Sequence, residues 1–271
     1  MNRRLRCALT VVLAVVFLAS TGLMLHRQLG DRQVETTYQE ALTLAMAAPA
    51  PTEAPAETLP PVTETVWVPA PVEEPDPHME ELAALDLAAL QQVNPDVLGW
   101  IRIPDTKIDY PFLQGKDNDY YLKHTWEGRN NAAGSIFLEC MNSPDLTDFN
   151  SIFYGHNMNS GAMFANLRKY TRQSFWETHP YVYLMTAQGV WRCEIFSAYK
   201  APVDSHTYGL SFQQEETKAH FLATALEESQ IETGVEPATT DRILTLSTCS
   251  GAGYTTRWVV HARLKMMETA A

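Results

Sequence analysis

The sequence predicts a mostly β fold with a few helices. Short runs rich in β-branched and aromatic residues fill the chain after residue 100, and clusters of Gly, Asn, Asp and Pro separate them. Many short strands divided by turn residues are typical of a closed barrel or a sandwich. The predicted strands span eight segments: 100–103, 108–112, 135–138, 151–154, 181–186, 190–200, 242–248 and 257–264.

The N-terminal segment has the composition of a membrane anchor. Three arginines precede an uncharged apolar run from Cys7 to Leu25. These 19 residues, at about 1.5 Å each, span roughly 28 Å, close to the thickness of a bilayer's hydrocarbon core. The flanking arginines favour a cytoplasmic N-terminus. A cleaved signal peptide is the alternative, but its apolar region would usually be shorter, at about 7–15 residues. We therefore expect a single-pass membrane protein whose folded part is extracytoplasmic.

A proline-rich segment follows this anchor. We predict a short helix over 34–46, and then nine prolines fall within residues 47–77, among many Ala, Thr and Glu. Such a composition buries no core and stays extended. The expected organisation is a cytoplasmic tip and signal anchor over 1–27, a juxtamembrane segment and Pro/Glu-rich stalk over 28–78, and a folded domain over 79–271.

Helices are expected at three places in the folded domain. Asp76 and Pro77 fit an N-cap and a first helical position, and the helix that they begin is predicted to end near Val93, before a proline. A second helical segment is predicted over 161–170.

The longest predicted helix of the folded domain runs from Ser211 to about Gln230. Ser211 and Gln214 match the S-x-x-Q pattern of a capping box, and apolar residues recur at helical spacing after them. The helix is inserted shortly before the strand 242–248.

A cysteine and an arginine are predicted to meet at one edge of the sheet. The buried strand 242–248 leads into Cys249, a glycine-rich loop follows, and the next strand opens with Arg257. Adjacent strands joined by a short loop pair antiparallel, which brings these two residues together. A fixed cation favours the thiolate, which is the nucleophilic form of cysteine.

The nucleophile also needs a base, and several histidines compete for that role. His156 follows an apolar strand and a glycine, in the sequence FYGHNM. His124 and His261 are the main rivals, since His261 shares a strand face with Arg257. The residues alone leave this choice open.

The motifs FYGHNM, TLSTC and RWVVHARL, in this order, resemble those of sortases, and more narrowly of class B sortases. The resemblance runs from about Asn94 to Leu264. It implies a closed eight-stranded β-barrel with an N-terminal helix and a long helix inserted before the cysteine strand. It also implies that Cys249 is the nucleophile, His156 its acid/base partner and Arg257 the cation on the oxyanion side.

The resemblance further implies a transpeptidase. Such an enzyme cleaves a C-terminal NPxTx-like sorting signal after Thr through a thioacyl intermediate, and transfers the secreted protein to a peptidoglycan amine. Four positions match the family's signal-binding groove: Asn118, Leu122, Tyr154 and Ser247. Ser250 stands where several relatives carry an acidic residue, and the loop before Arg257 is short and rich in glycine. Both differences bear on which signal is read.

Three other functions remain as alternatives. A pilin-polymerising sortase would use a lysine of another pilin as its acceptor. A papain-like cell-wall hydrolase would also use Cys and His, but there the cysteine comes first and begins a helix. A catalytically inactive wall-associated scaffold would be expected to lack one of the three residues His156, Cys249 and Arg257, and all three are present.

The composition of the chain also bears on nucleic-acid binding, metal binding and disulfide formation. The net charge of −12 argues against binding nucleic acid, which needs a basic surface. No His, Cys, Asp or Glu cluster has ligand spacing, so we expect neither a metal nor a cofactor. Three cysteines lie after the anchor, and a disulfide between Cys140 and Cys193 is left open, with two small buried thiols as the alternative.

Overall fold

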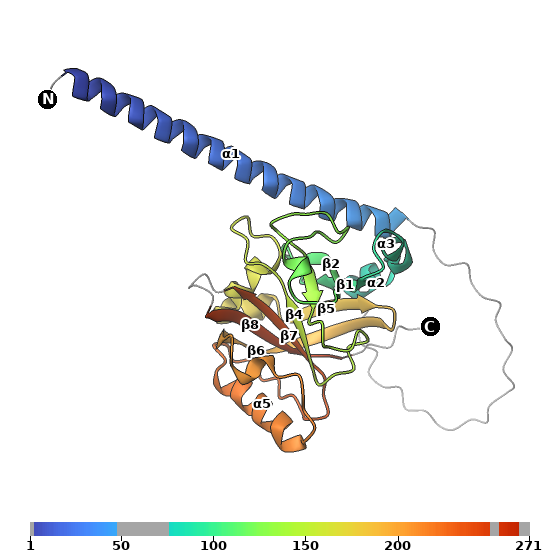
Figure 1. Cartoon of the computed structure of the whole chain (residues 1–271). Coiled ribbons are helices and arrows are strands. Elements are labelled where there is room, and N and C mark those ends of the chain that lie inside the picture. The colour runs from blue at the N-terminus through green and yellow to red at the C-terminus, as the bar shows by residue number, and fades with distance from the viewer. Residues whose placement is uncertain (1–2, 48–75, 250–254, 266–271) are drawn as a thin grey trace, which may run out of the picture.

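A computed structural model describes residues 3–47, 76–249 and 255–265 of the chain (Figure 1). Within the first helix, side chains are described at 13, 15–22, 24 and 35–47. The proline-rich segment predicted to be a stalk therefore falls outside the described residues over 48–75.

The predicted barrel is confirmed. Strands close in the order β1-β2-β3-β4-β7-β8-β6-β5, which excludes an open sandwich. Most neighbours are antiparallel, while β2 with β3 and β4 with β7 are parallel. The strands are β1 (Val97–Arg102), β2 (Asp109–Leu113), β3 (Ile136–Leu138), β4 (Asn150–Tyr154), β5 (Tyr181–Thr186), β6 (Gly189–Pro202), β7 (Ile243–Cys249) and β8 (Thr256–Arg263).

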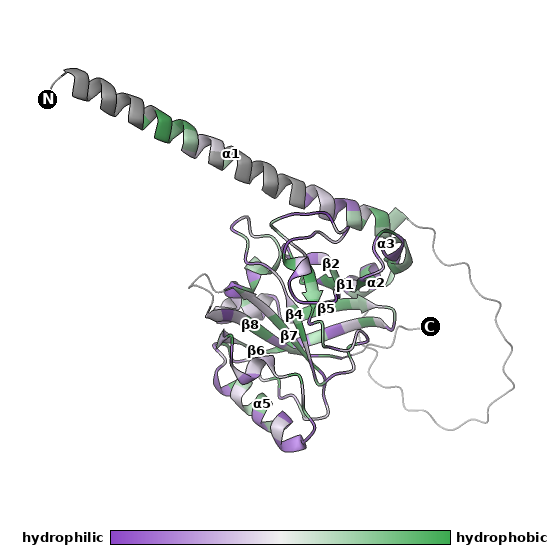
Figure 2. Cartoon of the chain, viewed as in Figure 1, coloured by the Kyte–Doolittle hydropathy of each residue, from purple (hydrophilic) through white to green (hydrophobic). Residues whose placement is uncertain are grey.

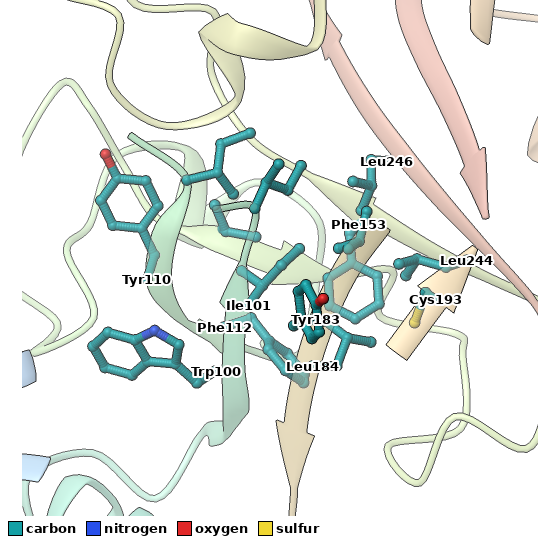
Figure 3. Close-up of a cluster of buried hydrophobic side chains, with 14 of the residues drawn as sticks. Trp100, Ile101, Tyr110, Phe112, Phe153, Tyr183, Leu184, Cys193, Leu244 and Leu246 are labelled. Carbon is teal, nitrogen blue, oxygen red and sulfur yellow. The ribbon is translucent and has the colours of Figure 1, made fainter. Parts of the chain in front are cut away.

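The barrel interior is filled with large apolar side chains, as the close-up in Figure 3 shows. Phe112 of β2 and Phe153 of β4 meet edge to face, with ring centroids 4.8 Å apart. Trp100 and Leu246 are fully buried in the same cluster. A second apolar cluster lies on the outer face of β6, β7 and β8, where helix α5 (Glu215–Glu227) covers it (Figure 1).

The helix expected from Asp76 to Val93 is divided in two. The Asp76 cap is confirmed, since its carboxylate accepts a hydrogen bond from the His78 N–H at 3.1 Å and begins α2 (Pro77–Ala83). Asp86 then caps α3 (Leu87–Val93) by accepting from the Ala89 N–H at 2.9 Å. Because Asp at an N-cap competes with a continuing helix, the chain restarts there.

The capping box predicted for the inserted helix is wrong. Gln214 is the N-cap of α5, its side chain makes no capping hydrogen bond, and Ser211 lies outside the helix. The segment predicted as a helix over 161–170 is the 3-10 helix η2 (Phe164–Thr171). The sequence reasoning missed three short elements: η1 (Tyr120–Leu122), α4 (Gln173–Thr178) and η3 (His206–Tyr208).

Helix α1 (Arg3–Ala47) is continuous, and its last turns pack against the barrel. The predicted short helix over 34–46 is thus the end of a longer one. Tyr38 is buried there, and its hydroxyl donates to the Gly134 carbonyl at 2.7 Å. The Trp126 indole N–H donates to the Thr37 carbonyl at 3.1 Å.

The remainder of α1 extends away from the barrel (Figure 1). Figure 2 shows a hydrophobic stretch there, and Leu13, Val15, Val16, Phe17 and Leu18 are each about 60–70% exposed. Among the residues that the structure describes, no helix combines the length and the apolar character needed to span a bilayer.

Candidate active site

The structure brings His156 and Cys249 to the same edge of the barrel. Strands β4 and β7 run parallel with Tyr154 opposite Ser247, so both end at the same edge. His156 lies two residues beyond β4, and Cys249 is the last residue of β7. The Asn157 side-chain amide donates to the Cys249 carbonyl at 2.8 Å, which ties the histidine loop to the cysteine strand.

The turn that carries His156 depends on a glycine. A Cβ on Gly155 would lie 2.8 Å from the Phe164 ring, too close for any other residue without displacing that ring. The Thr248 hydroxyl donates to the Gly155 carbonyl at 2.7 Å. Backbone approach and hydrogen bonding together fix this turn against β7.

Arg257 lies directly opposite Cys249. The two residues are partners in the antiparallel pairing of β7 and β8, as the order strand, short loop, strand predicts. Arg263, which shares the strand face, instead forms an ion pair with Glu194. The intervening residues 250–254, including Ser250 and the glycine-rich loop, lie outside the described part of the chain.

Electrostatics at this edge favour a charged thiol. The pKa of Cys249 is lowered from its ordinary value, first by hydrogen bonding to the His156 side chain and further by the charge of Arg257, against an opposing effect of burial. The pKa of His156 is raised, first by its interaction with Cys249. Each residue thus stabilises the ionised form of the other, and the pair titrates as one unit.

A backbone carbonyl orients the imidazole. His156 Nε2 lies 2.8 Å from the Leu122 carbonyl oxygen. Because a carbonyl only accepts, Nε2 carries the proton, and Nδ1 is the ring nitrogen left for the thiol. This contact also contributes to the raised pKa of His156.

The rival histidines occupy structural positions. His261 is fully buried between Thr245 and Tyr199, with ring nitrogens 2.9 and 3.0 Å from their hydroxyl oxygens. Burial lowers its pKa to about 3. His124 stacks on the Tyr120 ring with centroids 3.9 Å apart.

The four predicted groove residues lie on β4, on β7 and at η1. Tyr154 and Ser247 are partners across β4 and β7, and the Ser247 hydroxyl lies 3.0 Å from the hydroxyl of Tyr208. Leu122 ends η1 beside His156, and Asn118 lies just before η1.

Two residues that form hydrogen bonds with these four were not identified from sequence. Tyr208 meets Ser247 from η3, far away along the chain. Glu139 follows β3 and accepts hydrogen bonds from both Asn118 and Tyr154. An acid directly after a short apolar run was the available signal for Glu139, whereas nothing local marks Tyr208.

Cys140 and Cys193, the cysteines outside the candidate site whose side chains the structure describes, are free thiols. Cys193 is buried in the barrel near Leu244 (Figure 3), and burial raises its pKa. Cys140 is half-buried, and burial together with the neighbouring Glu139 raises its pKa. The disulfide left open by the sequence is absent between these two described residues.

Comparisons with known proteins agree with this geometry. The sortase domain model matches residues 101–265. Sortase B of Listeria monocytogenes is 40% identical over 164 residues, which cover 60% of this chain and 67% of the relative. Among solved structures, a Staphylococcus aureus sortase B–substrate complex is 32% identical, with a TM-score of 0.64 over 70% of this chain and 87% of the other. A Bacillus anthracis sortase B complex is 29% identical, with a TM-score of 0.70 over 89% and 100%.

Sortases are cysteine transpeptidases that act on proteins carrying sorting signals and on cell-wall amines. The family model covers most of the barrel, and sequence and structural relatives alike are sortase B proteins. This chain therefore belongs to the sortase family, among its class B members.

Proposed function

We propose that this chain is a membrane-anchored class B transpeptidase with Cys249, His156 and Arg257 as its catalytic residues. It would cleave a C-terminal NPxTx-like sorting signal after Thr and transfer the secreted protein to a peptidoglycan amine. The meeting of these three residues at one barrel edge is the observation that carries the proposal.

The chemistry follows from their arrangement. The Cys249 thiolate attacks the carbonyl carbon of the Thr in the signal, and the new C–S bond leaves a tetrahedral oxyanion that the Arg257 guanidinium stabilises. The His156 imidazolium then protonates the leaving amine as the C–N bond breaks, giving a thioacyl enzyme. An incoming amine attacks this thioester, gives its proton to His156 and restores the thiolate.

The sorting signal is proposed to lie along Asn118, Leu122, Tyr154 and Ser247. Support comes from the pairing of Tyr154 with Ser247, two residues before Cys249, and from the contact between Leu122 and His156. Asn118 is linked to Tyr154 through the Glu139 carboxylate. Support also comes from the relative in S. aureus, whose sortase B has been solved as a substrate complex.

The anchor is proposed to be the first half of α1. An uncharged apolar run from Cys7 to Leu25 behind three arginines supports this, as does the exposure of its described apolar side chains. The N-terminus would be cytoplasmic and the barrel extracytoplasmic. The segment 28–78 stays assigned to the juxtamembrane region and stalk, and 79–271 to the catalytic domain.

The full chain in nanodiscs, incubated with fluorogenic peptides carrying NPxTx and LPxTx cores, tests this function. We expect cleavage after Thr, a thioacyl adduct on Cys249 detected by mass spectrometry, and a transfer product that depends on an added wall-type amine. Cys249→Ala should abolish the adduct, while His156→Ala and Arg257→Ala should lower the rate of acylation by at least about 100-fold.

Two exposed residues provide matched controls. His220→Ala on α5 and Arg172→Ala beside α4 remove the same side-chain types away from the site and should retain the wild-type rate. A folded wild-type protein that forms no adduct with any peptide would contradict the proposal and favour a scaffold. Transfer only to a lysine of a pilin would identify a polymerising sortase.

A further inference from the structure

We propose that Glu139 is a positioning residue for the signal-binding groove, because its carboxylate sets the orientation of Asn118 and Tyr154. This inference rests on the proposed function and deepens it, since it names the residue on which the recognition of the sorting signal depends.

Glu139 is a buried acid that only neutral groups compensate. Its side chain is at the end of β3, and the residue is 6% exposed. The Asn118 amide nitrogen lies 2.7 Å from both carboxylate oxygens, and the Tyr154 hydroxyl donates to one of them at 3.0 Å. Within the described residues, no lysine, arginine or histidine forms an ion pair with Glu139.

Such a site is costly for folding. Transfer of a carboxylate out of water is compensated only when several donors converge on it, and an apolar replacement is often as stable. Core stability alone therefore gives no reason for an acid here. The Met141 N–H at 3.3 Å and the Cys140 thiol at 3.4 Å also donate to this carboxylate. Its shortest hydrogen bonds, however, come from Asn118 and Tyr154 of the proposed groove, which points to a role in organising that groove.

The backbone of Glu139 is rigidly held, so its carboxylate is a fixed reference point. Its N–H donates to the Ile152 carbonyl at 2.8 Å. Its own carbonyl accepts from the Asn142 N–H at 2.9 Å and from the Gln114 side-chain amide at 2.9 Å. Groups held in this way position their partners more accurately than groups on free loops.

The carboxylate determines which atoms of Asn118 and Tyr154 remain for a ligand. The Asn118 carbonyl oxygen accepts from the Cys140 N–H at 2.9 Å, so both ends of this amide are held and its orientation is fixed. Tyr154 is kept as a hydroxyl that donates to Glu139, which leaves its oxygen lone pairs to accept from a bound peptide.

Glu139→Gln provides the first test, measured on the full chain with the signal peptide that the wild type cleaves. The carboxamide has one acceptor oxygen, and its NH2 group would face the NH2 group of Asn118. We expect KM to rise about tenfold or more, a change typical for a lost hydrogen bond to a charged group, with a smaller fall in kcat. Alkylation of Cys249 by iodoacetamide and its pH profile should stay as in the wild type.

Reversal of the hydrogen bond tests the geometry directly. In the double variant Asn118→Asp/Glu139→Gln, the carboxamide donates to the new carboxylate, which still accepts from the Cys140 N–H. KM should return to within about threefold of the wild type, a residual expected from imperfect geometry. Asn118→Asp alone sets two carboxylates against each other and should raise KM at least as much as Glu139→Gln.

Glu216→Gln, at an exposed position of α5, is the matched control and should change neither parameter. Unchanged KM in a folded Glu139→Gln variant would overturn the inference. So would a double variant no better than the singles, or equal losses in thiol alkylation. If Glu139→Gln does not fold, the comparison of Asn118→Asp with the double variant decides. A wild-type protein that no peptide acylates would instead defeat the proposed function itself.

Discussion

Cys249 and His156 each shift the pKa of the other, and this makes thiol reactivity a measurable property of the pair. Loss of a group that stabilises the thiolate raises the cysteine pKa and lowers its reactivity at neutral pH. We expect the alkylation rate of Cys249 to rise at a lower pH in the wild type than in His156→Gln. Arg257→Gln should show a smaller upward shift, since the arginine charge has the weaker effect.

This pH dependence can be followed by iodoacetamide labelling, with the modified peptide identified by mass spectrometry, because Cys140 and Cys193 are also free thiols. His220→Gln serves as the control. Identical profiles in all variants would show that Cys249 has no electrostatic partner in solution.

The sequence alone predicted that Cys249 lies opposite Arg257, because two strands joined by a short loop pair with each other. The choice between His156 and His261 was different. Strand periodicity gives the face of a side chain but not what covers that face, and here the rings of Phe196 on β6 and Phe221 on α5 pack against the buried His261. Glu139 escaped notice because its partners Asn118 and Tyr154 come from other segments.

Among the structural elements, the loop around η1 is the one on which His156 depends most directly. Gly134 has φ +58°, and a Cβ there would lie 2.4 Å from the Tyr121 carbonyl oxygen and 2.8 Å from that of Leu122. Gly134→Ala should therefore displace the carbonyl that orients His156. We expect a loss of about 1–3 kcal/mol in the free energy of unfolding.

The same substitution should also slow acylation, which peptide cleavage assays and urea unfolding would measure together. Gly234→Ala is the control, because Gly234 has φ +69° but no atom within 4 Å of a built Cβ. Equal rates of acylation in the two variants would mean that the Leu122 carbonyl does not control the imidazole.

Element by element, the strands were predictable because each is a short apolar run bounded by turn residues, and β5 has the predicted limits. The boundaries of the helices were harder to predict from the sequence. The cap at Asp86 divides a segment whose apolar spacing continues across it, and η2 is a 3-10 helix whose apolar pattern resembles an α-helix over eight residues.

For the whole molecule, the docking of α1 should contribute measurable stability. Tyr38 is 3% exposed and packs edge to face on Tyr110, with ring centroids 4.9 Å apart. Tyr38→Ala should lower the free energy of unfolding by about 3 kcal/mol, as for other buried aromatic truncations. Glu40→Ala, two residues further along α1 at an exposed position, should have little effect on the free energy of unfolding. Equal urea midpoints for the two variants would argue that α1 is not docked in solution.

In an anchored chain, the contact between α1 and α3 would limit how far the barrel can lie from the membrane. The Asp86 N–H donates to the Ala45 carbonyl at 2.9 Å, so the chain is already at the barrel before it enters residues 48–75 and returns to the same place afterwards. In an anchored chain, the 13 residues from Leu25 to Tyr38, at about 1.5 Å each, would hold the barrel roughly 20 Å from the apolar run. The distance between Cys249 and the membrane surface would then stay nearly constant, and the enzyme would meet its substrates close to the membrane as they emerge.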